Sequence, residues 1–278
     1  IERKAGVEKT AGFFLMLFIV AGTFAVVYGI LYVANLIHPV LRFCLETFFI
    51  YQILATKSLK TESMKVYKKL KEGDLIGARK EVSYLVGRDT ENLDESEVAK
   101  ADVETIAENT ADGVIAPMLF IAIGGAPLGF AYKAVNTLDS MVAYKNEELI
   151  NIGFFSAKMD DICNFIPARF AAVMLMIASL ILRFDFKGAV KIFKRDRFAH
   201  LSPNSAQTEA VAAGALQIQL GGTHNYFGKA VVKPTIGDDI RPVEYEDIKR
   251  TNQLLYVSAV LSMAVCCLIT FLIYVQLF

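Results

Sequence analysis

Two long stretches without a charged side chain, residues 10–37 and 254–278, constrain the fold of this chain more than any other feature. A helix of about 20 apolar residues crosses the hydrocarbon core of a bilayer. Both stretches exceed that length, so they predict two transmembrane helices. The alternative is a pair of core helices in a soluble protein, but apolar runs this long are rare in soluble cores. The sequence therefore indicates an all-α, polytopic integral membrane protein.

The first stretch favours a retained span over a signal peptide, because it is too long for a signal-peptide core and lacks a clear cleavage site. The chain begins at Ile1 rather than Met, so we expect the natural protein to have residues before it. The four cysteines have no CxxC or Cys/His spacing, so neither a zinc site nor a disulfide framework is predicted. The 29 basic and 29 acidic side chains balance, which argues against a nucleic-acid partner.

The rest of the chain reads as one helical domain, 1–278, with a helical portion that faces the cytoplasm. Its predicted segments are a further span at 39–56, soluble-facing helices at 57–112, 133–145 and 185–250, and apolar segments at 113–132 and 162–182. For 39–56 a position on the bilayer surface stays open, because Arg42 and Glu46 lie within it.

The apolar segments 113–132 and 162–182 decide the topology. The first contains two prolines and four glycines and makes a poor straight helix. Lys and Arg precede both outer spans, which places those ends in the cytoplasm. We predict that the two segments enter the membrane only partly and wall a cavity open to the cytoplasm. Two complete crossings are the alternative.

Three acidic side chains have the spacing of one helix face. Glu104, Glu108 and Asp112 lie at i, i+4 and i+8, with Asn109 beside them. Carboxylates at this spacing repel each other unless a cation lies between them, and Mg²⁺ prefers oxygen ligands. The stripe predicts a site for Mg²⁺ or a substrate amine. A solvated acidic face is the alternative.

A second set of polar residues follows segment 113–132. Lys133 and Asn136 share a helical stripe, and Asp139 is adjacent. These side chains can contact phosphate and metal. An ordinary capped polar helix is the alternative.

A third set lies at the start of segment 162–182. Asp160 and Asp161 precede Asn164 and Arg169. An arginine at the edge of an apolar helix is costly unless it is paired or lines a polar cavity. Arg169 is therefore predicted either to bind phosphate or to form a salt bridge with one of the two aspartates.

A fourth set opens a helix of small residues, expected over 207–220 and followed by a loop at 233–241. Asn204 and Glu209 lie around its start, where free N–H groups can hold an anion. Its Ala and Gly content is equally typical of close helix packing. His200, just before it, has no assigned role.

Six ordered motifs carry a resemblance to a known family. They are Glu-Thr-Ile-Ala-Glu-Asn-Thr-Ala-Asp-Gly (104–113), Gly-Gly-Ala-Pro (124–127), Tyr-Lys-Ala-Val-Asn-Thr-Leu-Asp-Ser-Met (132–141), Asp-Asp-Ile-Cys-Asn-Phe-Ile-Pro-Ala-Arg (160–169), Ser-Pro-Asn (202–204) and Ala-Gly-Ala-Leu…Leu-Gly-Gly (213–222). The chain resembles the CobD/CbiB family, the adenosylcobinamide-phosphate synthases of cobalamin biosynthesis. Arg88-Asp89-Thr90 fits as well, whereas Ala206, Gln207 and Thr208 depart from the family pattern.

The resemblance implies an ATP- and Mg²⁺-dependent ligase in the cell membrane, with its active site facing the cytoplasm. It would join adenosylcobyric acid, a corrinoid, to 1-amino-2-propanol O-phosphate or a close amino-alcohol. Other enzymes of the cobalamin pathway are candidate partners.

The residues singled out above have the types that this chemistry requires. Catalytic roles are assigned to Glu104, Glu108, Lys133, Asp139, Asp160 and Asp161. Substrate or phosphate binding is assigned to Asn109, Asn136, Asn164, Arg169, Asn204 and Glu209. Metal binding is assigned to Glu104, Glu108 and Asp112.

Two other classes of protein stay open. A transporter would use the intramembrane Arg169 and the interrupted segment 113–132, but it predicts polar residues in several spans, and the two clear spans have no charge. A non-enzymatic membrane sensor related to the family would be indicated by loss of the acids at 104, 108 and 112, which are present.

Overall fold

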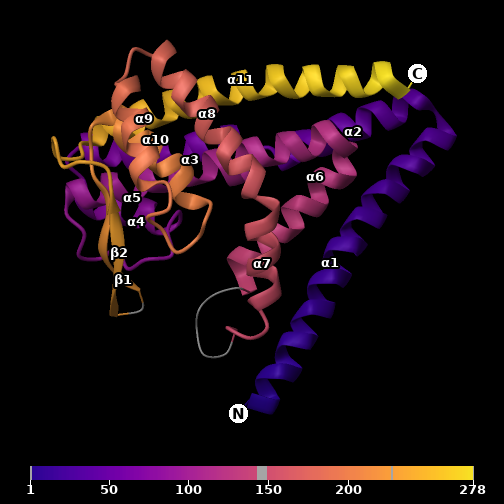
Figure 1. Cartoon of the computed structure of the whole chain (residues 1–278), viewed down its shortest axis with the longest axis horizontal. Coiled ribbons are helices and arrows are strands. Elements are labelled where there is room, and N and C mark those ends of the chain that lie inside the picture. The colour runs from indigo at the N-terminus through magenta and orange to yellow at the C-terminus, as the bar shows by residue number, and fades with distance from the viewer. Residues whose placement is uncertain (1, 143–148, 227, 278) are drawn as a thin grey trace. The chain divides into compact units, whose positions relative to one another are not determined.

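The computed structural model describes residues 2–142, 149–226 and 228–277, and most of them are helical (Figure 1). The chain forms two compact units. Unit 1 comprises Ile1–Leu54, Ala116–Phe165 and Val265–Phe278, and unit 2 comprises Ala55–Ile115 and Ile166–Ala264. Each unit is described by itself below.

Unit 1 is built on a long apolar helix, α1 (Glu2–Ile37), which packs against three others. These are α2 (Pro39–Ile53), α6 (Ala116–Val142) and α7 (Phe154–Cys163). Neighbouring residues alone fix the turn from α1 into α2. The His38 ring accepts a hydrogen bond from the Val40 N–H at 3.1 Å, and a proline begins the new helix.

Helix α6 is broken in its middle, as the glycines and prolines of segment 113–132 predict. Gly124 and Gly125 leave the helical conformation, and Gly125 has a φ of 66°. A β-carbon on Gly125 would lie 2.6 Å from the Glu46 carboxylate, which accepts a hydrogen bond from the Ala126 N–H at 3.4 Å. The chain therefore needs glycine here, and the acid of α2 satisfies the backbone where the helix resumes.

The helix expected at 133–145 is not a separate element. Lys133 lies inside α6, which continues through the break to Val142. The end of that expected helix lies outside the described residues. The physical reason for the continuation is that no helix-breaking residue separates Phe130 from Val142.

Unit 2 begins with the three helices expected between 57 and 112. They are α3 (Thr56–Lys71), α4 (Leu75–Ser83) and α5 (Glu95–Asn109). Asp74 caps α4, and Asp94 forms a capping box with Glu97 at the start of α5. A short π-helix, η1 (Thr110–Ile115), follows α5.

The second half of unit 2 contains α8 (Phe165–Ile181), α9 (Phe186–Asp196) and α10 (Ser205–Leu216). Figure 1 shows α9 lying beside α10, and these two helices pack closely. A β-carbon on Gly214 would lie 2.4 Å from the Gly188 carbonyl oxygen. The two backbones therefore touch, which explains the small residues of α10.

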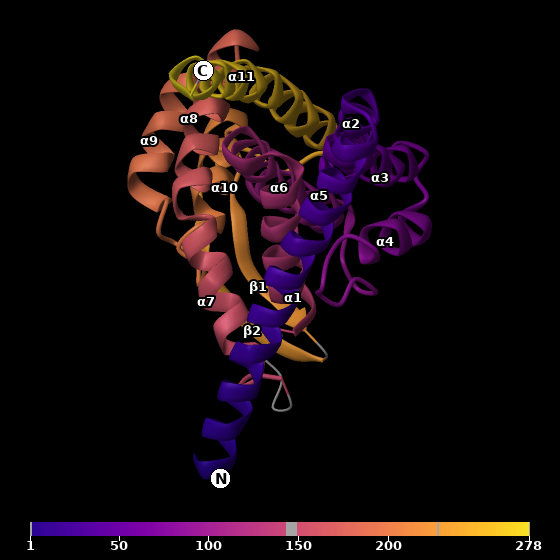
Figure 2. The ribbon, with the colours of Figure 1, turned by 90° about the vertical axis from the view of Figure 1, so that its right-hand side faces the viewer.

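A two-stranded antiparallel hairpin, which the sequence did not predict, follows α10 (Figure 2). Its strands are β1 (Leu220–Tyr226) and β2 (Lys229–Ile236). The helix expected over 207–220 ends earlier, at Leu216, because Gln217 adopts a left-handed conformation, and the loop expected at 233–241 starts as strand. Gly221 and Gly222 have positive φ where the register of the two strands shifts.

Within the residues that the structure describes, three helices are long and apolar enough to cross a membrane. They cover Lys4–Ile37, Glu95–Val142 and Tyr245–Ile273, the last belonging to α11 (Tyr245–Leu277). The pair Phe154–Cys163 and Phe165–Ile181 would make a fourth span if it counts as one, although it is bent by 46°. The fold class expected from the sequence, a polytopic all-helical membrane protein, is confirmed.

The expected span at 39–56 and the depth reached by the two interrupted segments stay predictions. Helix α2 has 15 residues, about 22 Å of helix against a hydrocarbon core of about 30 Å.

Candidate functional site

A buried ion pair joins three segments of unit 2. The Arg88 guanidinium donates to Glu104 Oε2, and the Gly221 N–H donates to Glu104 Oε1 at 2.7 Å. Arg88 Nη1 also lies 2.9 Å from His224 Nδ1. Glu104 belongs to α5, Arg88 to the loop after α4, and the other two residues to β1, so the ion pair fixes the hairpin against α5.

The start of α10 gathers several residues that the sequence singled out. Glu108, one turn after Glu104, accepts a hydrogen bond from Ser205 Oγ at 2.8 Å. Arg169 Nη1 donates to Asn204 Oδ1 at 3.3 Å. A carboxylate, a guanidinium and an amide thus meet where α10 begins.

Glu209, one turn into α10, is 6% exposed and lines a small cavity in unit 2. Glu104, His200 and Lys233 line the same cavity, whose volume is about 10 Å³. A space of this size fits one water molecule or a monatomic ion, not a substrate. We call Glu104, Glu108 and Glu209, with Arg88, His200 and Lys233, the carboxylate cluster.

The electrostatics of this cluster favour an added proton or cation. Burial raises the pKa of Glu209 well above its usual range, and the nearby carboxylates of Glu108 and Glu104 raise it further. Burial lowers the pKa of His200, although Glu108 opposes that shift. Burial also disfavours the charged Lys233, but a hydrogen bond with Tyr226 and the carboxylates outweigh it and raise its pKa.

The carboxylate oxygens of this cluster are the ligand type that Mg²⁺ prefers, but they do not surround an ion completely. Among the described residues, no group of three or more His, Cys, Asp or Glu side chains could hold a metal ion. Glu104 is already occupied by Arg88 and Gly221. Because Mg²⁺ is usually held by one or two carboxylates together with substrate phosphates and water, Glu108 and Glu209 still fit it.

The third acid of the predicted stripe lies in the π-helix. Asp112 belongs to η1, whose turn is wider than that of the α-helix that contains Glu104 and Glu108. Asn109 donates to the Thr105 carbonyl of its own helix at 3.0 Å. The first two acids of the predicted stripe therefore belong to the carboxylate cluster, and Asp112 follows a different backbone geometry.

A second cluster lies within unit 1, between α6 and α7. The Tyr132 hydroxyl donates to Asn164 Oδ1 at 2.7 Å, and Asn164 Nδ2 donates to Asp160 Oδ2 at 3.0 Å. Asn136 Nδ2 lies 3.4 Å from Asp160 Oδ1 as a further donor. We call these four residues the amide cluster. Three of them were singled out from the sequence.

The remaining predicted residues of unit 1 lie on the same two helices. Lys133 and Asp139 are half-buried on α6, and Asp161 on α7 pairs with Lys158 at 3.5 Å. The carboxylate cluster and the amide cluster belong to different units. A single ATP site, as the family resemblance implies, requires Glu108, Lys133, Asp160 and Asn204 to converge on the cytoplasmic side, and this convergence stays a prediction.

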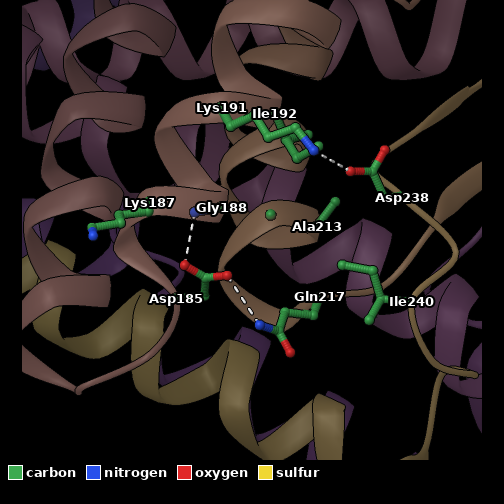
Figure 3. A pocket seen from close by; sticks show the side chains of 10 residues that line it. Asp185, Lys187, Gly188, Lys191, Ile192, Ala213, Gln217, Asp238 and Ile240 are labelled. Atoms are coloured by element: carbon green, nitrogen blue, oxygen red, sulfur yellow. Dashed lines mark hydrogen bonds and ion pairs between the residues drawn. The ribbon is translucent and has the colours of Figure 1, made fainter.

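A larger cavity, of about 400 Å³, lies elsewhere in unit 2 (Figure 3). Three of its charged groups already have partners: Asp185 accepts from the Gly188 N–H at 2.8 Å and from Gln217 at 3.0 Å, and Lys191 pairs with Asp238 at 2.8 Å. The residues that line it include no predicted site residue. We therefore place the candidate site at the carboxylate cluster, because of its chemistry rather than its volume.

Sequence reasoning missed the basic half of the carboxylate cluster. Lys233 was expected in a loop, and His200 had no assigned role. Arg88 could have been singled out from the sequence, because Arg88-Asp89-Thr90 matches the family pattern.

The fold and the site together define a polytopic helical membrane protein. Its unit 2 buries carboxylates beside the imidazole of His200 and the amine of Lys233. The chain belongs to the CobD/CbiB family: the model of the CobD/Cbib protein family matches residues 1–255. No solved structure matches the chain significantly.

Its relatives are similar over at least four fifths of their own length. Cobalamin biosynthesis protein CobD of Clostridium perfringens is 55% identical over 261 residues, which cover 94% of this chain and 83% of that protein. The CobD protein of Streptococcus sanguinis is 52% identical, over 92% of this chain and 81% of its own. Cobalamin biosynthesis protein CbiB of Salmonella choleraesuis is 46% identical, over 92% and 80%.

Proposed function

We propose that this protein is an ATP-dependent amide ligase of cobalamin biosynthesis. It joins a propionate carboxylate of adenosylcobyric acid to the amine of 1-amino-2-propanol O-phosphate, or of a close amino-alcohol, to give adenosylcobinamide phosphate. Membership of the CobD/CbiB family, whose relatives are named as cobalamin biosynthesis proteins, supports the pathway. The observation that carries the chemistry is the carboxylate cluster at the start of α10.

The reaction needs an activated acid, because a carboxylate and an ammonium group do not condense in water. The corrinoid carboxylate attacks the terminal phosphorus of ATP, which releases ADP and leaves an acyl phosphate. The amine, after losing a proton, attacks the acyl carbon, and phosphate leaves with the C–O bond electrons. Water must be excluded, since it would hydrolyse the acyl phosphate.

The side chains of unit 2 have the types that these steps require. Glu108 and Glu209 supply carboxylate oxygens for Mg²⁺, which when bound neutralises charge on the ATP phosphates. Arg169, held against Asn204, binds a substrate phosphate. Glu104 holds Arg88 and β1 in place rather than the metal.

The side chains of unit 1 supply the remaining contacts. Lys133 binds the second phosphate-bearing substrate, with Asp139 and Asp161 nearby on α6 and α7. The amide cluster positions Asp160, whose two oxygens accept from Asn136 and Asn164.

Purified protein in detergent tests the proposal directly. With ATP, Mg²⁺, adenosylcobyric acid and aminopropanol phosphate, we expect the amide product by mass spectrometry and one ADP per amide. Omission of any component, or chelation of Mg²⁺, should stop both products. Folded protein that makes no amide from the complete mixture would contradict the proposal.

The proposed ligase works on cytoplasmic ATP, so its site faces the cytoplasm. A cysteine in place of Ile150, which is exposed in the turn before α7, tests this in a background without the four native cysteines. We expect no modification by an impermeant reagent added outside intact cells. Labelling from outside would place the α6–α7 turn on the wrong side for a partial crossing.

A further inference from the structure

Helix α8 carries a stripe of exposed apolar side chains. Ile166, Val173, Leu180 and Ile181 are 73%, 45%, 59% and 56% exposed. Their spacing places them along one side of the helix. In a membrane protein such a stripe faces lipid, because water would not tolerate it. The stripe ends with the helix, at Ile181.

Helix α9 begins five residues later and has a basic side. Lys187, Lys191 and Lys194 are exposed and lie within about 60° of one another around the helix axis. Beside them runs a half-buried apolar stripe of Phe186 and Phe193. The opposite side of α9 is buried at Ala189 and Ile192, so the lysines face outward.

The positive charge on this side is only partly neutralised. Lys191 pairs with Asp238, and Arg195 pairs with Asp196 and Asp238. Neither Lys187 nor Lys194 forms an ion pair within the described part of the chain. Figure 3 shows Lys187 directed away from the carboxylate of Asp185.

We propose that the basic side of α9, formed by Lys187, Lys191 and Lys194, binds the phosphate headgroups of anionic phospholipids. A helix with lysines beside an apolar stripe is typical of the membrane interface, where the apolar side chains enter the boundary and the ammonium groups meet the headgroups. Lysines directly after a lipid-facing segment attract anionic lipids.

Two nearby features favour a bilayer over a soluble phosphate or a nucleic acid. The α8 stripe leads directly into α9 along the same chain, and Phe198 and Leu201 beyond α9 are 64% and 67% exposed. Arg197 lies over the ring of Phe198 at 4.9 Å, which keeps a cation next to this apolar surface. A soluble polyanion would require neither of these apolar surfaces.

The test uses the full chain in zwitterionic detergent, with phosphatidylglycerol or phosphatidylcholine added at increasing mole fraction. We expect phosphatidylglycerol to raise the midpoint of thermal unfolding and phosphatidylcholine to have little effect. Each lysine near an anionic surface contributes a similar amount to the free energy of lipid binding, about fivefold to sixfold in affinity. The Lys187→Gln/Lys194→Gln variant, which lacks two lysines, should therefore need roughly 30-fold more phosphatidylglycerol for half of the effect. Added salt should reduce the effect in wild type.

Two matched variants make the result specific to α9. Lys187→Arg/Lys194→Arg keeps both charges and should behave as wild type. Lys68→Gln/Lys80→Gln removes two exposed lysines from α3 and α4 and should also leave the lipid effect unchanged. An equal phosphatidylglycerol effect in the α9 glutamine variant would overturn the proposal. So would full reproduction of the effect by glycerol phosphate, which carries the same anion without a bilayer.

Discussion

The amide cluster and the carboxylate cluster both bury polar side chains, but they are assembled differently. The amide cluster comes from two helices that follow each other in the chain, and its pairs Tyr132–Asn136 and Asp160–Asn164 repeat the i, i+4 spacing. The carboxylate cluster draws on α5, α10, two loops and the hairpin, and it sets buried charges against each other. The first cluster depends on local helix geometry, whereas the second depends on distant segments meeting.

Breaking the buried ion pair should therefore have the largest effect on stability. Arg88→Ala leaves Glu104 buried with its charge uncompensated, which typically costs about 3–5 kcal/mol of unfolding free energy. Removing both partners, as in Arg88→Met/Glu104→Leu, should cost less than Arg88→Ala alone. Lys65→Ala, at an exposed ion pair, is the control and should change stability by less than about 1 kcal/mol. Detergent-phase unfolding measures all three, and a wild-type midpoint for Arg88→Ala would show that the pair does not fix the hairpin.

The next effect is catalytic. Glu108→Gln should reduce amide formation on the order of 100-fold or more, because the carboxylate that we propose as a ligand of Mg²⁺ becomes a neutral amide. Its unfolding midpoint should stay near wild type, since Ser205 can donate to the amide oxygen as well. Glu62→Gln, at an exposed acid on α3, should keep full activity. Normal turnover of Glu108→Gln would rule out the metal assignment.

Two cations, Arg169 in unit 2 and Lys133 in unit 1, test the proposed roles of the two units. Arg169→Ala and Lys133→Ala should each raise the KM for one phosphate-bearing substrate by about 10-fold or more, because a charge-assisted hydrogen bond is lost. We expect different substrates to be affected in the two variants. If Arg169→Ala unfolds the protein while KM is unchanged in the folded fraction, its role is structural.

A milder effect is expected in the amide cluster. Tyr132→Phe removes the donor to Asn164 Oδ1, a buried hydrogen bond of 2.7 Å, and should cost about 1–2 kcal/mol. The ring still stacks on Phe120, so packing is retained. Thermal unfolding of this variant and of Tyr28→Phe, an exposed tyrosine on α1, gives the comparison. If Tyr132→Phe lowered the unfolding free energy as much as Arg88→Ala, the amide cluster would not be the weaker contributor to stability.

The smallest effect concerns pH. Burial, with Arg88 nearby, lowers the pKa of His224 to about 4, below its ordinary value of about 6.5 in an unfolded chain. The folded state then binds fewer protons in this window, so the unfolding free energy falls as the pH drops from about 6.5 toward 4. For this half-exposed ring we expect a loss below about 1 kcal/mol. His224→Gln should reduce the acid sensitivity, and an unchanged pH profile would refute this linkage.

The contrast between the clusters also explains how far sequence reasoning reached. Asn136 was singled out because helical spacing places it on one stripe with Lys133, and the stripe at Glu104 and Glu108 was found for the same reason. Asp160 and Asn164 were singled out because they lie with Arg169 at the start of an apolar segment. Each of these predictions needed only residues that are close in the sequence.

Features that depend on distant segments were not predictable in this way. Lys233 reaches the carboxylate cluster only because β2 pairs with β1, and β1 is positioned by Arg88 from more than a hundred residues earlier. The hairpin itself was hidden, because its glycines also fit a helix stop. The π-helix at Thr110–Ile115 has no periodic signature, so the sequence placed Asp112 on a continuing α-helix. The metal-binding role of Asp112 stays a prediction.

The contact between Gly188 and Gly214 has a consequence for how this sequence can change. Neither residue carries a functional group, yet any side chain at either position must push two helix backbones apart. Such a displacement would move the outward lysines of α9 and, through α10, the residues around Glu209 at the same time. Two positions without chemistry of their own would then tolerate as little variation as the ionised residues that they position. A survey of natural variants that looked only for reactive side chains would overlook both.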